Sequence, residues 1–161
     1  MKRIAISIML LTGIISFNFN VFSQEDFAAK VKASMKMLQD KTSELGEAKL
    51  VDEILSFGDT RINGDYDIVD EVADVNGGTA TIFMAKDDGF IRVSTNVIKE
   101  GNRAIGTILD PKGPAIGPIQ QGQAFYGKAD ILGSMYETGY EPIKDKEGKI
   151  IGILYVGYKL S

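Results

Sequence analysis

The fold is decided by residues 79–95, which read TATIFMAKDDGFIRVST. Two runs rich in β-branched and apolar residues, 79–85 and 90–95, flank the turn-forming residues Asp87-Asp88-Gly89. β-Branched side chains favour strands, and Asp and Gly favour tight turns between them. The stretch therefore predicts a β-hairpin of two antiparallel strands.

A second hairpin is predicted towards the C-terminus. Residues 140–143 and 149–157 flank the turn sequence Asp145-Lys146-Glu147-Gly148. Residues 124–132 are typical of one more strand. Between the two hairpins lies a Gly/Pro-rich stretch, residues 101–122, which holds three of the four prolines.

On the N-terminal side, residues 26–57 are predicted as a helical region. Phe27, Val31, Met35 and Leu38 recur at three- and four-residue spacing, and apolar residues resume after Gly46, where the helix is expected to kink or end. This apolar stripe has two interpretations: it packs on the chain's own core, or it pairs with a second copy of the chain. A long helix followed by several antiparallel strands predicts the α+β class.

The first residues have the layout of a secretory signal. Lys2 and Arg3 precede an apolar run, residues 4–17, and a small residue, Ser23, closes the segment. We expect cleavage before Gln24, which leaves residues 24–161 as one periplasmic or secreted domain. The alternative is an uncleaved membrane anchor, although spanning a bilayer takes roughly 20 apolar residues and this run is shorter.

Composition excludes several classes of site. The chain has no His, no Cys and no Trp, and its net charge is −4. Ser-His-Asp and Cys-His catalysis, disulfides and ordinary zinc sites are therefore excluded, and the negative charge argues against nucleic acid as a partner. The acidic residues gather in turns without the spacing of a calcium loop. We predict no enzyme, no metal and no cofactor.

Arg92 is the first candidate for ligand binding, because it interrupts an apolar strand. Strict alternation would place Phe90, Arg92 and Ser94 on one face of that strand and Val93 and Thr95 on the other. One interpretation is that Arg92 binds a small carboxylate, because a guanidinium matches the geometry of a carboxylate. The alternative is that Arg92 lies on the solvent-exposed face of the sheet. Arg103 lies in a polar loop, where a bracing role is expected.

Three tyrosines close to glycines are the second candidate. Tyr126, Tyr136 and Tyr140 fall within a short stretch that is predicted to form neighbouring strands. Each offers an apolar ring and a hydroxyl that can bond a ligand oxygen, although a core position is the commoner fate of a single tyrosine. Together with Arg92 they favour a small pocket with polar tips.

Several blocks of the chain, in order and from about Ile62 to the C-terminus, resemble the Cache 3/Cache 2 fusion domain. The blocks are 63–70, 80–83, 89–95, 102–110, 122–129, 136–143 and 151–157. The resemblance implies a PAS-like extracellular sensor fold over residues 62–161, with a long N-terminal helix packed on a central antiparallel sheet. It also implies a ligand held between the sheet and the loops that cover it, as in the outer domains of bacterial chemoreceptors and sensor kinases.

The resemblance also implies which residues contact the ligand. Related citrate-type sensors carry an Arg followed three residues later by a polar side chain, which corresponds to Arg92 and Thr95. Their second contacting strand precedes a Pro-Ile pair, which places Thr138 and Tyr140 at the equivalent positions, and Tyr126 is carried over as well. Those sensors have His and Lys where this chain has Thr95 and Tyr140. The lost positive charge favours a smaller monocarboxylate, such as acetate, propionate or pyruvate.

We therefore expect a non-enzymatic, stand-alone exported domain that binds a small organic acid for chemotaxis or other signal transduction. It would act as a co-sensor for a membrane receptor or sensor kinase, or as a ligand binder, since the sequence ends where a second membrane helix would begin. The alternative is a ligand-free interaction or dimerisation module that works with such a receptor or kinase.

Overall fold

The computed structural model describes residues 19–160 of the 161-residue chain. Of the predicted signal peptide, residues 1–18 lie outside the described residues, and residues 19–23 begin a helix. Cleavage before Gln24 and the division at residue 23 stay predictions. The elements, in chain order, are α1 (Phe19–Leu45), β1 (Ala48–Val51), β2 (Ile54–Phe57), β3 (Thr60–Arg61), α2 (Asp67–Asn76), β4 (Thr79–Lys86), β5 (Gly89–Thr95), β6 (Ile98–Lys99), β7 (Asn102–Arg103), α3 (Ile116–Gln120), β8 (Phe125–Ile131), β9 (Ser134–Lys144) and β10 (Ile150–Lys159).

The apolar stripe of α1 packs on the chain's own core. Val31, Met35 and Leu38 are fully buried, and α1 lies against β9 and β10. The predicted helix is confirmed over this part of the chain. Because Leu38 has no exposed surface, it is not available to a second copy, and a homodimer through this helix stays a prediction that needs other residues.

The predicted helix is wrong beyond Leu45. Residues 48–57 form the hairpin β1–β2, whose two-residue turn places Asp52 and Glu53 at positive φ. Gly46 lies at φ 118°, and a Cβ there would come within 3.0 Å of the Cα of Gly58, where β2 has ended. The apolar spacing of this stretch fits a helix or two short strands, and the close approach of the two glycines selects the strands.

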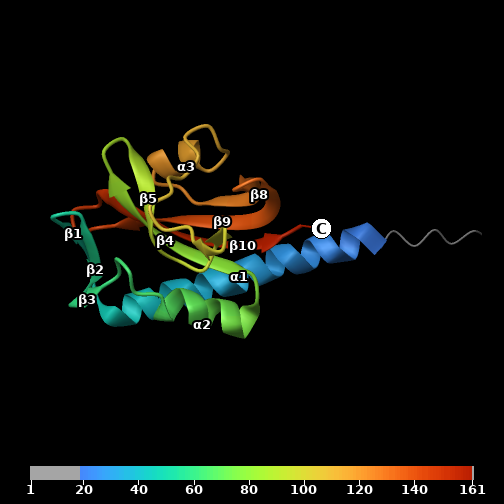
Figure 1. Ribbon diagram of the computed structural model, residues 1–161, viewed down its shortest axis with the longest axis horizontal. Coiled ribbons are helices and arrows are strands. Elements are labelled where there is room, and N and C mark those ends of the chain that lie inside the picture. The colour runs from blue at the N-terminus through green and yellow to red at the C-terminus, as the bar shows by residue number, and fades with distance from the viewer. Residues whose placement is uncertain (1–18, 161) are drawn as a thin grey trace, which may run out of the picture.

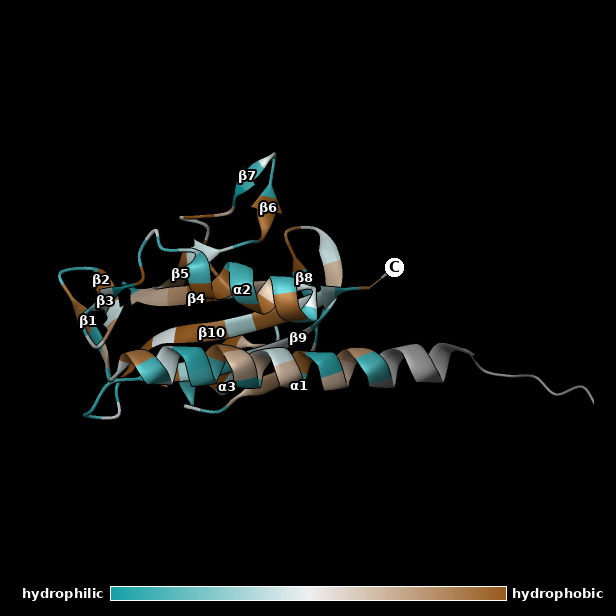
Figure 2. Cartoon of the chain, turned by 90° about the horizontal axis from the view of Figure 1, so that it is seen from below, coloured by the Kyte–Doolittle hydropathy of each residue, from teal (hydrophilic) through white to brown (hydrophobic). Residues whose placement is uncertain are grey.

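The centre of the molecule is a five-stranded antiparallel sheet of order β5-β4-β10-β9-β8. The two predicted hairpins, β4–β5 and β9–β10, and the predicted strand β8 are confirmed. Helices α1 and α2 cover one face of the sheet, while α3 and the neighbouring loops cover the other (Figures 1 and 2). The α+β class and the PAS-like arrangement of helix and sheet are also confirmed.

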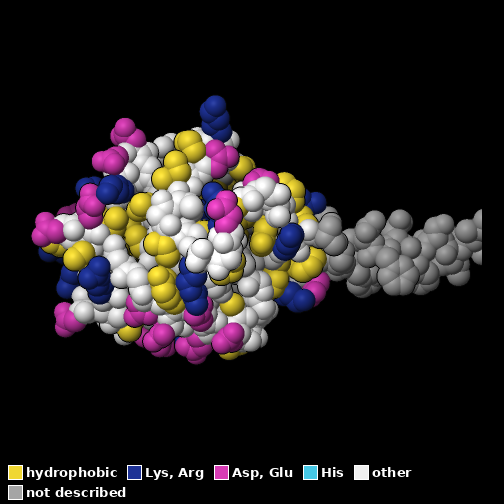
Figure 3. Space-filling view, viewed as in Figure 1, with side chains coloured by type: hydrophobic (Ala, Val, Ile, Leu, Met, Phe, Trp, Pro, Cys, Tyr) yellow, Lys and Arg dark blue, Asp and Glu magenta, His cyan; other side chains and the backbone are white. Residues whose placement is uncertain are grey.

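Helix α2 and the surface over it are acidic. Asp67 and Asp70 lie in the first turn of α2, where a negative charge interacts favourably with the helix dipole. Val69 and Val72 of the same helix are buried against the sheet. Figure 3 shows acidic side chains gathered along the lower edge of the molecule, where α2 lies. Within residues 19–160, no helix is both long and apolar enough to cross a membrane.

A β-bulge in β5 overturns the strict alternation expected for this strand. Ile82 pairs with Ser94 and Phe83 pairs with Arg92, so Val93 is the extra residue. The bulge brings Thr95 to the sheet face that carries Arg92, and it moves Ser94 to the face of Ile82. The prediction of opposite faces for Arg92 and Thr95 is therefore wrong, because one inserted residue inverts the alternation after it.

Close packing between β10 and β4 generates a stability prediction. A Cβ at Gly152 would collide with the carbonyl oxygen of Phe83, a backbone atom of the paired strand that cannot rotate away. We expect Gly152→Ala to lower the free energy of unfolding by about 1–3 kcal/mol in urea denaturation, the usual cost of overpacking.

Gly89→Ala is the matched control, because Gly89 also lies in a strand and a Cβ there would meet nothing within 4 Å. The control should change the free energy of unfolding by no more than about 0.5 kcal/mol. Equal effects of the two substitutions would contradict the prediction.

Candidate functional site

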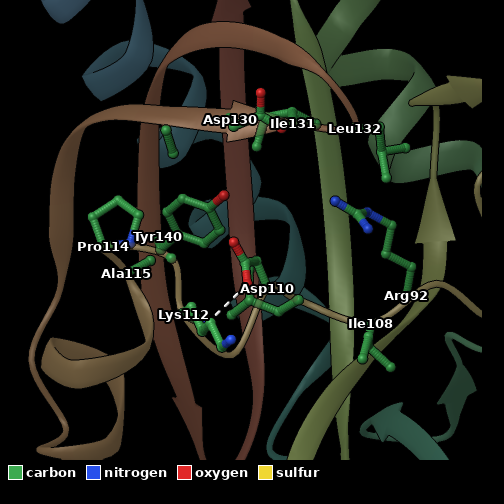
Figure 4. A pocket seen from close by; sticks show the side chains of 13 residues that line it. Arg92, Ile108, Asp110, Lys112, Pro114, Ala115, Asp130, Ile131, Leu132 and Tyr140 are labelled. Atoms are coloured by element: carbon green, nitrogen blue, oxygen red, sulfur yellow. Dashed lines mark hydrogen bonds between the residues drawn. The ribbon is translucent and has the colours of Figure 1, made fainter.

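The candidate site is a cavity of about 340 Å³ on the face of the sheet opposite α1. Residues of β5, β8 and β9 line it, together with the turn between β8 and β9 and the segment that leads to α3 (Figure 4). The residues that line the cavity are Arg92, Ile108, Leu109, Asp110, Lys112, Gly113, Pro114, Ala115, Ala129, Asp130, Ile131, Leu132 and Tyr140.

Arg92 is a buried cation at one side of this cavity. Its side chain is only 3 % exposed, and the guanidinium carbon lies 4.8 Å from the centre of the Phe83 ring. Nη1 donates a hydrogen bond of 2.7 Å to Oγ1 of Thr107, and Nε is buried without a partner. Within residues 19–160, no carboxylate forms an ion pair with Arg92.

Burial lowers the pKa of Arg92 from its ordinary value. An arginine nevertheless stays protonated in proteins, so the site holds a positive charge that has lost most of its hydration. A buried charge of this kind is unfavourable unless an opposite charge or further hydrogen bonds compensate it. The cavity is where such a compensating group has room.

Tyr140 supplies a second polar group to the same cavity. Its ring is buried against Tyr155, with 4.9 Å between ring centres, and against Phe125 at 6.1 Å. Figure 4 shows its hydroxyl on the cavity side of the ring, where it has no hydrogen-bond partner among the described residues. Burial raises the pKa of Tyr140 well above its ordinary value, so the hydroxyl keeps its proton and can donate it.

The mouth of the cavity combines apolar side chains with charges of both signs. Ile108 is 63 % exposed and Leu132 is 42 % exposed, although both line the cavity. Asp110 accepts a hydrogen bond of 2.9 Å from the backbone N–H of Lys112, which closes the turn at this edge. The arrangement can take an anion at Arg92 and a hydrogen-bond acceptor at Tyr140, beside an apolar surface.

The cavity brings together two of the five predicted ligand contacts, Arg92 and Tyr140. Thr95 and Thr138 lie on the same face of the sheet but are fully buried and do not line the cavity. Thr95 bonds Oγ1 of Thr81 at 2.6 Å, and Thr138 donates to the carbonyl oxygen of Gly127. Their hydroxyls are engaged in holding the strands together.

Tyr126 lies on the opposite face of the sheet, and the structure does not bring it to this site. It pairs with Gly139 in the β8–β9 register, one residue out of phase with Tyr140. Its hydroxyl donates to Glu141 at 2.7 Å, and its ring covers Gly139 beside Val31 of α1. The prediction for Tyr126 is corrected because the period-two alternation of β9 separates it from Tyr140.

Most of the cavity wall comes from residues that sequence reasoning did not single out. Ile108 to Ala115 belong to the Gly/Pro-rich stretch, and Leu132 lies in the turn between β8 and β9. The one available signal was Leu132-Gly133, because leucine is unusual in a tight turn that needs positive φ.

Arg103 has the bracing role expected of it. Its guanidinium forms a two-pronged ion pair with Asp70 of α2, with both N···O distances 2.7 Å, and Nη1 also donates to the carbonyl oxygen of Thr95. The ring of Tyr66 lies 4.4 Å from the guanidinium carbon. This ion pair ties α2 to the start of the segment that forms the cavity wall.

The chain matches a family model over most of its length. The Cache 3/Cache 2 fusion domain matches residues 10–161, which extends the resemblance found from Ile62 onward to include α1. A search of the curated proteins finds no significant match.

Two solved structures are similar in shape. The first is a GAF domain of A. aeolicus nlh2 in an inactive state, with 12 % identity and a TM-score of 0.45, where the likeness covers 83 % of this chain and 79 % of that chain. The second is a light-oxygen-voltage domain from a study with a flavin analogue, with 16 % identity and a TM-score of 0.40, where it covers 60 % of this chain and 87 % of that chain.

The contrast between the two arginines generates a second prediction. Arg92→Met replaces a buried, incompletely bonded cation by an apolar side chain, and we expect it to raise the free energy of unfolding by about 1–3 kcal/mol. Arg103→Met removes a paired, half-exposed cation, and we expect it to lower that free energy by about 1–2 kcal/mol.

Urea denaturation of both variants, in buffer without carboxylates, measures the two changes. A loss of stability in Arg92→Met as large as that in Arg103→Met would contradict the assignment of Arg92 as an unfavourable buried charge.

Proposed function

The chain belongs to the Cache 3/Cache 2 fusion domain family, a family of extracellular-type sensing domains, and on that premise we propose that it binds a small organic carboxylate in the cavity beside Arg92. Cache domains are typically non-enzymatic. Binding, and not turnover, is therefore the activity proposed here. The same premise supports a periplasmic or secreted location for the domain.

One observation carries the proposal: the guanidinium of Arg92 is buried beside a cavity, its Nε lacks a partner, and no carboxylate of the described residues pairs with it. A ligand carboxylate would supply the missing acceptor and the opposite charge together. Charge-assisted hydrogen bonds between a guanidinium and a carboxylate are short and directional, which suits recognition of a small anion.

The polar groups around Arg92 favour a ligand with a single negative charge. Tyr140 offers a neutral hydroxyl, and the exposed charged residues that line the cavity are two carboxylates and one cation: Asp110, Asp130 and Lys112. The single buried cation, Arg92, cannot neutralise the three negative charges of a tricarboxylate. This agrees with the monocarboxylate class, which includes acetate, propionate and pyruvate.

The alternative function, a ligand-free interaction module, explains the site less well. Without a ligand, the fold would retain an incompletely bonded buried cation that a methionine or leucine could replace at a gain in stability. Retention of such a group is expected where binding needs it. A membrane receptor or sensor kinase remains the partner that we propose for passing on the bound state.

Isothermal titration of residues 24–161 with a panel of small organic acids, which includes acetate, propionate, pyruvate and longer straight-chain monocarboxylates, tests the proposal. We expect at least one of these acids to bind, and we expect Arg92→Gln to weaken that binding about ten- to hundredfold, which corresponds to the loss of about 1.5–3 kcal/mol from a charge-assisted bond.

Lys99→Gln is the control, because Lys99 is an exposed cation of β6 that does not line the cavity. It should leave the affinity unchanged. Equal affinities of the wild-type and Arg92→Gln proteins would refute the carboxylate site.

A further inference from the structure

We infer that the carboxylate ligand of this site carries an extended apolar body, of the size of a straight-chain acid with about six to eight carbons or an aryl-substituted short acid. This inference rests on the proposed function, since it takes the carboxylate contact at Arg92 as given. It concerns the part of the ligand that lies beyond that contact.

The volume of the cavity is the first argument. The cavity has a volume of about 340 Å³, which falls in the range of roughly 300–1,000 Å³ that is usual for small-molecule sites. Acetate fills only a small part of such a space. A two- or three-carbon acid bound at Arg92 would leave water against the apolar part of the wall, which gives little binding free energy.

The distribution of polarity within the cavity is the second argument. Arg92 lies at one side, and Pro114 and Ala115 lie at the other with the ring of Tyr140 near them, while Asp110 lies between the two sides (Figure 4). Ala129 and Ile131 of β8 add buried apolar surface to the wall. A ligand with its carboxylate at Arg92 would therefore extend its other end over apolar side chains.

The side chain of Leu132 is the third argument. Leu132 and Gly133 form the two-residue turn between β8 and β9, with φ of 52° and 90°. Turns with positive φ at both central residues favour Asn or Gly at the first position, and a leucine there is strained. Leu132 nevertheless occupies the position and exposes 42 % of its surface at the mouth of the cavity. Backbone strain of this kind concentrates at binding sites.

Ile108, on the other side of Arg92, is a second exposed apolar side chain at the cavity. It is 63 % exposed, it lines the cavity, and Figure 4 shows Arg92 between Ile108 and Leu132. Both side chains lie on the Arg92 side of the cavity, where they can cover the first methylenes of a ligand whose far end reaches Pro114 and Ala115. Burial of these methylenes adds affinity that acetate, which has none, cannot gain.

A homologous series of acids tests the inference on the wild-type domain. Isothermal titration with acetate, propionate, butyrate, hexanoate and octanoate, and with 3-phenylpropanoate, should give a dissociation constant that falls about fourfold for each methylene up to about six carbons. Acetate binding as tightly as hexanoate would overturn the inference and leave the proposed function intact. Failure of every acid to bind would overturn both.

Leu132→Asn separates ligand contact from fold stability. Because Asn suits the turn, we expect an equal or higher melting temperature and about tenfold weaker binding of hexanoate. Ile98→Asn is the control: Ile98 is 59 % exposed but does not line the cavity, so hexanoate binding should not change. Unchanged hexanoate binding in Leu132→Asn would overturn the inference.

Discussion

The guanidinium of Arg92, buried without a carboxylate partner, is the constraint around which this face of the molecule is arranged. The ring of Phe83 lies beneath it, and Thr107 accepts its only side-chain hydrogen bond among the described residues. The backbone of Arg92 is bonded to the same segment, since its N–H donates to the carbonyl of Thr107 and its carbonyl accepts from Gly106. Arg92 therefore connects the sheet and the cavity with the covering segment, which is residues 104–115.

The covering segment is held at its start by the second arginine. Arg103 pairs with Asp70 of α2 and also donates to the carbonyl oxygen of Thr95, so the segment is fixed to a helix on one side and to β5 on the other. The two arginines illustrate opposite uses of one side chain. The charge of Arg103 is paired with a carboxylate, whereas the charge of Arg92 is buried beside a cavity and is paired with no carboxylate of the described residues.

Sequence patterns predicted the strands well and the connections poorly. The hairpins β4–β5 and β9–β10 have dense β-branched runs and strong turn residues, so local preference and tertiary structure agree there. Residues 48–57 have apolar spacing that fits both a helix and a hairpin, and contact between Gly46 and Gly58 decides between them. The bulge at Val93 has no local signal, because it depends on how β5 pairs with β4.

The candidate site divides in the same way. Arg92 could be identified in advance because a charge inside an apolar strand is anomalous, and Tyr140 could be identified from its motif. Tyr126 could not be separated from Tyr140 without knowing the register of β8 against β9, which places the two rings on opposite faces. The walls of the cavity could not be predicted either, because Ile108 and Ala115 of the segment before α3 converge with Leu132 of the turn between β8 and β9.

The amino-acid sequence by itself determined the α+β class, the two hairpins, the absence of His and Cys chemistry and the place of a lone arginine in a buried strand. These features depend on composition and on neighbours within a few residues. Only the tertiary structure decided which hydroxyls face Arg92, that its charge has no carboxylate partner among the described residues, and how large the adjoining cavity is. Those properties depend on strand register, one bulge and the packing of distant loops, which no local pattern specifies.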